Sequence, residues 1–170
     1  MPAYLERPIE VFRIHPAVLW VSALIGLLLQ TFLPLVLPLA RLMDFPLLVT
    51  IYFALVRRNK IFGIGLGTVM GLLQDALSHG YIGIFGMAKA LVGYLGAASS
   101  LRFELESVVA RIILTGFFVA IHGLALAGLD RVLLDPPPRF EPLTLASSVL
   151  VNVALGLMLF IILDRFRHPA

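Results

Sequence analysis

Long apolar runs, separated by short polar segments, constrain this chain more than any other feature of its sequence. The run from Ala17 to Ala40 contains no charged side chain, and about 20 apolar residues are enough for a helix to cross the hydrocarbon core of a bilayer. Hydrophobic residues make up 60% of the chain and charged residues only 14%, too little polar material to cover a soluble domain. We therefore predict an all-α integral membrane protein that contacts the lipid bilayer.

The apolar runs predict a polytopic bundle of about six transmembrane helices. We expect a single domain over residues 16–164, an interfacial or frayed N-terminal segment over 1–15 and a tail over 165–170. The predicted spans are Ala17–Leu39, Phe45–Val56, Ile61–Ser78, Tyr81–Ser99, Ser107–Leu129 and Leu143–Leu163. The second run is short, so it must extend back through Arg41, tilt or cross incompletely. The one sizeable loop is Asp130–Pro142.

Basic residues predict the orientation of the bundle. With the N-terminus in the cytoplasm and six alternating spans, nine of the 13 Lys and Arg residues fall inside, three fall outside and Lys89 lies within a span. Inside loops of membrane proteins carry such an excess. We therefore expect both termini in the cytoplasm and a second run that crosses. Because the basic residues lie at helix ends, the net charge of +3 does not indicate a nucleic-acid partner.

The third and fourth spans carry small and charged residues in an otherwise apolar setting. Gly63, Gly67 and Gly71 follow one another at four-residue spacing, which lets another helix backbone approach closely. The neighbouring helix could be a partner's or, more commonly, one of the same bundle. Asp75 and Lys89 are intramembrane charges, each costly alone. Side chains in a helix lean toward its N-terminus, so in an antiparallel hairpin these two are predicted to pair. The pair could fix the structure of the hairpin, or it could form a polar site for a ligand or proton.

Other polar residues within the spans indicate packing more than chemistry. His122 and Asn152 lie mid-span, and Gln30 and Thr31 lie near the middle of the first span; we expect them to form hydrogen bonds between helices. The chain has no cysteine, no nucleophile elbow, no zinc-binding pair and no phosphate-binding loop. We therefore predict no enzyme, no catalytic or metal residues and no cofactor.

The hairpin also carries a family resemblance. Residues 71–95 read GLLQDALSHGYIGIFGMAKALVGYL, and they resemble the centre of the rod shape-determining protein MreD family, with its G-L-x-x-D-x-L-S, short turn, G and L-V-G-Y-L. The resemblance extends over most of the chain. Asp75, Gly83, Gly93 and Tyr94 occupy motif positions. The suspected structural or partner-binding residues are therefore Gly67, Gly71, Asp75, Gly83, Lys89, Gly93 and Tyr94.

The resemblance implies a fold and a role. The fold would resemble the six-helix S components of energy-coupling-factor transporters. The role would be that of a non-enzymatic inner-membrane component of the elongasome, which organises or regulates lateral peptidoglycan synthesis and rod shape. Its direct partner would be MreC, which would connect it to the synthases RodA and penicillin-binding protein 2. On the cytoplasmic side the partner would be MreB.

The alternative is a substrate-binding membrane subunit of a vitamin transporter, which would share this fold. That reading predicts a polar, ligand-lined cavity over Asp75, Lys89, His122 and Asn152. An organising role instead predicts that these four groups satisfy one another and leave no sizeable cavity.

Overall fold

The bundle is built from six α-helices in the part of the chain that the computed structural model describes, residues 12–78, 81–100 and 107–169. Four of these helices, α1, α3, α5 and α6, are long and apolar enough to cross a membrane. The elements in chain order are β1 (Phe12–Ile14), α1 (Pro16–Val36), the 3-10 helix η1 (Pro38–Leu42), α2 (Phe45–Arg57), α3 (Lys60–Ser78), α4 (Ile84–Ser99), α5 (Val108–Leu133), α6 (Pro142–Asp164) and β2 (Arg167–Pro169). The predicted helical membrane bundle is confirmed, with four full-length candidate spans in place of six.

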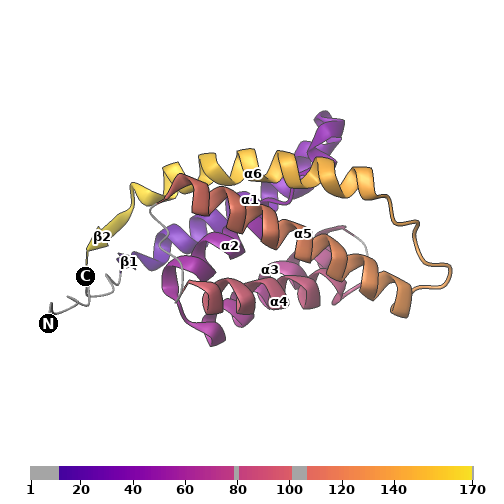
Figure 1. Ribbon diagram of the computed structural model, residues 1–170, viewed down its shortest axis with the longest axis horizontal. Coiled ribbons are helices and arrows are strands. Elements are labelled where there is room, and N and C mark those ends of the chain that lie inside the picture. The colour runs from indigo at the N-terminus through magenta and orange to yellow at the C-terminus, as the bar shows by residue number, and fades with distance from the viewer. Residues whose placement is uncertain (1–11, 79–80, 101–106, 170) are drawn as a thin grey trace, which may run out of the picture.

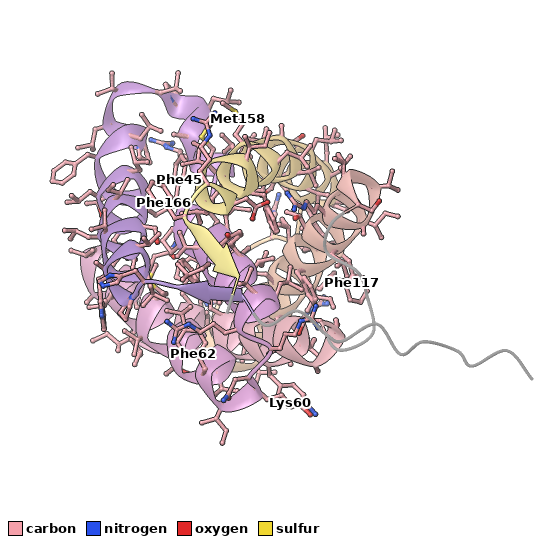
Figure 2. The ribbon with its side chains drawn as sticks, turned by 90° about the vertical axis from the view of Figure 1, so that its left-hand side faces the viewer. Phe45, Lys60, Phe62, Phe117, Met158 and Phe166 are labelled. Carbon is pink, nitrogen blue, oxygen red and sulfur yellow. The ribbon has the colours of Figure 1, made fainter. Side chains whose placement is uncertain are left out.

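The short second helix is the core of the bundle. Every residue of α2 from Pro46 to Val56 is buried, and α2 contacts all five other helices. Figure 2 views the bundle from the end that carries the β1–β2 ribbon. Its 13 residues correspond to about 20 Å, against a hydrocarbon core of about 30 Å. Of the three alternatives for this run, the extension back through Arg41 is excluded, because Arg41 belongs to η1 and α2 begins at Phe45. A helix that lipid does not reach has no need to match the bilayer thickness.

Helices α3 and α4 form a tightly packed hairpin. A Cβ atom added to any of three α3 glycines would overlap the α4 backbone: Gly63 against Gly93, Gly67 against Lys89, and Gly71 against Phe85 and Gly86. Gly65, on the same helix, has nothing within 4 Å of such an atom. The small-residue face of α3 is therefore filled by α4 of the same chain, and these three glycines are not free to receive another helix.

The two ends of the described chain meet. Strand β1 pairs with β2 in an antiparallel ribbon, with Ile14 opposite Arg167, and the ribbon lies at one end of the bundle (Figure 1). The interfacial or frayed N-terminal segment expected over residues 1–15 falls mostly on residues 1–11, outside the described residues. Helix α2 contacts β1, so the junction of α2 and α3, with Arg57, Arg58 and Lys60, lies at the ribbon end. Because both ends of the described chain lie together, the chain runs an even number of times along the bundle.

Candidate functional site

A buried ion pair joins the entrance of α2 to the middle of α4. Lys89 Nζ donates to Asp44 Oδ2 over 2.6 Å; the Lys89 side chain is fully buried and that of Asp44 is 13% exposed. Asp44 is the N-cap of α2, and its Oδ1 accepts a hydrogen bond from the Leu47 N–H. Helix α2 is about 10 Å shorter than the hydrocarbon core, and its C-terminal end carries Arg57 and Arg58, which favour the membrane surface. We therefore infer that its N-cap lies at membrane depth, where a carboxylate needs a partner.

His122 completes this cluster from α5. Its Nε2 lies 3.3 Å from Lys89 Nζ, and its Nδ1 lies 3.8 Å from Asp44 Oδ2. Because a lysine ammonium can only donate, we assign Nε2 as the acceptor of this contact and the ring proton to Nδ1, on the side of the carboxylate. Phe85 stacks on the imidazole with ring centroids 6.1 Å apart, and Lys89 Nζ lies 4.9 Å from the centroid of the Phe85 ring. His122 is thus in hydrogen-bonding contact with Lys89, and the Phe85 ring packs against both side chains.

Side chains from α1 and α6 satisfy the backbone where η1 meets α2. Asn152 Oδ1 accepts from the Asp44 N–H over 2.8 Å, and its Nδ2 donates to the Leu42 carbonyl over 2.7 Å. Ser148 Oγ donates to the same carbonyl, and Gln30 Oε1 accepts from the Phe45 N–H. The predicted bonds between helices are confirmed for Gln30 and Asn152. Thr31 instead bonds within α1, to the Leu27 carbonyl.

Asp75 does not pair with Lys89, so that prediction is wrong. Its carboxylate caps the N-terminus of α4, where it accepts from the N–H groups of Gly83 over 2.8 Å, Phe85 over 3.2 Å and Gly86 over 3.3 Å. Gly83, the N-cap of α4, has φ +108° and no side chain to cap with. Only glycine adopts that backbone readily, and the carboxylate from α3 supplies the missing acceptor and complements the positive end of the helix.

Replacing Asp75 by alanine should destabilise the protein by about 1–3 kcal/mol, since three N–H groups at the start of α4, one of them buried, lose a charged acceptor. Asp75→Asn keeps one acceptor oxygen and should lose less. Unfolding of the purified variants in mixed detergent micelles measures both effects. Equal stability of Asp75→Ala and the wild-type protein would contradict the capping role.

A small pocket adjoins the polar cluster. Its volume is about 220 Å³, and its lining includes Asp44, Gln74, Phe85 and His122. Gln74 is 6% exposed, and its Oε1 has no hydrogen-bond partner among the described residues. Lys89 and Asp75 do not line this pocket. A volume of this size holds several waters but is below the roughly 300–1,000 Å³ of small-molecule sites.

The remaining predicted residues lie in the α3–α4 contact or on the exposed surface of the bundle. Gly67, Gly71 and Gly93 lie in the α3–α4 contact. Tyr94 is 40% exposed on α4, with Lys60 Nζ 5.8 Å from its ring centroid. No group of three or more His, Cys, Asp or Glu residues able to hold a metal ion occurs within the described ranges.

Asp44 is the one residue of the cluster that the sequence patterns above did not single out. Two signals pointed to it: an aspartate two residues before a proline is typical of a helix N-cap, and the run after it is too short to carry it to the membrane surface. Read together, they place a carboxylate at the depth of Lys89. The predicted buried pair was therefore correct in kind but assigned to the wrong aspartate.

These features define a polytopic helical membrane protein whose polar groups tie the helices to one another. The family described as rod shape-determining protein MreD matches residues 12–166, nearly the whole chain. The chain belongs to the MreD family. No match was found in the comparison with curated proteins or in the comparison with solved structures.

Proposed function

We propose that this protein is a non-enzymatic inner-membrane component of the elongasome, which organises or regulates lateral peptidoglycan synthesis. The observation that carries the proposal is the family match over residues 12–166, since the family is described by a role in rod shape. The partners would be MreC, through it RodA and penicillin-binding protein 2, and MreB on the cytoplasmic side.

Basic residues support a cytoplasmic position for both termini. Arg57, Arg58 and Lys60 lie in the α2–α3 connection, and Arg111 and Arg165 lie at the matching ends of α5 and α6. The opposite end has fewer: Arg41, Arg131 and Arg139. The positive-inside rule then places the β1–β2 ribbon in the cytoplasm. The Asp44–Lys89 cluster lies toward the periplasmic half.

The polar cluster favours an organising role over solute binding. The polar atoms of the cluster form hydrogen bonds with one another and with the backbone. Its members are Asp44, Lys89, His122 and Asn152. Such a network holds α2, α4, α5 and α6 in one arrangement, as a platform for partners requires. No reactive group is left in the cluster without a structural partner.

One observation supports a second candidate, a substrate-binding subunit of a solute transporter with the S-component fold. The pocket beside the cluster has an unpartnered amide oxygen at Gln74, as a ligand site would. Its volume of about 220 Å³ is too small for a vitamin-sized molecule without rearrangement, which is why we place this candidate second.

Complementation separates the two candidates. In a rod-shaped bacterium depleted of its own MreD-family protein, expression of this chain should restore cell length and width, measured by microscopy. The same chain, produced with energy-coupling-factor ATPases in a vitamin auxotroph, should not support growth on trace vitamin. Round cells despite normal membrane levels of the protein, together with rescue of the auxotroph, would overturn the elongasome proposal.

Co-purification tests the proposed partners directly. The tagged protein, extracted from native membranes in mild detergent, should retain the MreC-family protein of the same cell, and the wall synthases with it. Recovery of transporter ATPases in their place would support the second candidate.

A further inference from the structure

A surface cleft opens between the last turns of α5 and the segment that leads to α6. Its volume is about 750 Å³, within the range of small-molecule sites. The α5–α6 connection, which supplies part of the lining, lies at the end of the bundle opposite the β1–β2 ribbon (Figure 1). Its lining residues are Leu124, Ala127, Gly128, Arg131, Pro137, Pro138, Arg139 and Phe140. The walls are therefore largely apolar, with two guanidinium groups.

The depth of the cleft matches the boundary between hydrocarbon and headgroups. Arg111 and Arg131 both lie on α5 and are 20 residues apart, which is about 30 Å along the axis and equals the hydrocarbon thickness. With one arginine at each boundary, Arg131 lies at headgroup level. Leu124 lies about 10 Å deeper, beyond a headgroup region only about 5–8 Å thick. The cleft thus reaches from the headgroups into the acyl chains.

The surroundings of the cleft face lipid. Leu124 is 55% exposed, and the nearby Phe140 and Leu143 are 50% and 80% exposed. Lipid can therefore enter the cleft from the side, without leaving the membrane. A water-soluble ligand would have to enter past this apolar rim.

The charge of the cleft is positive. Neither Arg131 nor Arg139 forms a salt bridge with a described residue, and none of the described carboxylates lines the cleft. The acidic residues of the same segment do not cancel this charge within it: Glu141 accepts a hydrogen bond from Thr144, and Asp130 and Asp135 are absent from the lining. Guanidinium groups are suited to bind phosphate through paired hydrogen bonds.

We propose that this cleft binds the headgroup of an anionic phospholipid, with its phosphate between Arg131 and Arg139 and its acyl chain along Leu124 and Ala127. A site of this kind combines the charge of the headgroup with the apolar chain, which neither a free phosphate nor a peptide carboxylate offers. The proposal is independent of the elongasome role, because it rests only on the α5–α6 end of the bundle.

Native mass spectrometry of the full-length protein tests the proposal. Detergent micelles are doped with equal amounts of phosphatidylglycerol and phosphatidylcholine, and the ratio of the two lipids retained is measured. One arginine near an anionic surface is worth roughly a five-fold preference. The wild-type protein should therefore retain phosphatidylglycerol at least about ten-fold better, and Arg131→Gln/Arg139→Gln should reduce the ratio to near one.

A second variant distinguishes a built site from general surface charge. A Cβ atom at Gly128 meets nothing within 4 Å, so Gly128→Leu should fold normally, keep both arginines and fill the cleft. It should lose the retained lipid. Arg41→Gln, which removes a charge at the same end of the bundle but outside this cleft, should keep the wild-type ratio.

Two results would overturn the proposal. One is an unchanged lipid ratio in both the double arginine variant and Gly128→Leu. The other is displacement of the lipid by millimolar inorganic phosphate, which would mark the arginines as a site for a free anion.

Discussion

Replacing Gly67 by leucine should abolish the stable fold, with a loss expected to exceed about 4 kcal/mol. A Cβ atom at this position would overlap the Lys89 carbonyl on α4. Overpacking usually costs about 1–3 kcal/mol when side chains can move aside. Here the obstacle is a helix backbone, so the whole hairpin must separate, and losses of that size are diagnostic of such clashes. We expect little of this variant in the membrane.

Gly65→Leu is the matched control, because it places the same side chain on the same helix, two residues away. Nothing lies within 4 Å of a Cβ at Gly65, and leucine favours a helix over glycine by roughly 1 kcal/mol. This variant should be at least as stable as the wild-type protein in detergent unfolding. If Gly67→Leu matched Gly65→Leu, the α3–α4 contact described above would be wrong.

Replacing Lys89 by methionine should cost about 3 kcal/mol. The change leaves the Asp44 carboxylate without its ammonium partner at membrane depth, and breaking a buried pair by removing one member costs about 3–5 kcal/mol. The lower end of that range applies because the Asp44 side chain is 13% exposed and water can relieve part of the charge. Unfolding in mixed micelles, with helicity as the signal, measures the loss.

A double-mutant cycle identifies the partner of Lys89. Asp44→Asn keeps an acceptor for the Leu47 N–H, so Lys89→Met/Asp44→Asn should recover much of the loss. Lys89→Met/Asp75→Asn should instead show additive losses, since Asp75 serves the α4 N-terminus. Recovery with Asp75 and additivity with Asp44 would restore the pairing that the sequence first suggested.

The α3–α4 hairpin shows which contacts can be predicted from residues that are close in the sequence. Gly63, Gly67 and Gly71 predict a close helix contact from spacing alone, because only a small residue lets two backbones meet. The partner helix follows from the short connection after Ser78, which makes α4 the nearest neighbour in sequence. Local spacing also indicated intramembrane charges at Asp75 and Lys89, but it did not tell which charge serves a helix end and which pairs with another charge.

The polar cluster shows which contacts cannot be predicted from residues that are close in the sequence. Asp44 and Lys89 are 45 residues apart, and Asp44 and Asn152 are 108 apart. Contacts at such separations depend on which helices are neighbours. The small pocket and the cleft at Arg131 depend on the same arrangement, so neither could be predicted from the sequence.

The sequence by itself determined that this protein is a helical membrane bundle, where most helices begin and end, and to which family it belongs. Long apolar runs, helix-end signals and the hairpin motif are all local, so they can be read without a structure. Only the tertiary structure decided that α2 is the core helix and that Asp44 is the partner of Lys89. The physical reason is that lipid is as apolar as the protein interior. Hydrophobic pattern therefore does not distinguish a buried helix from an outer one.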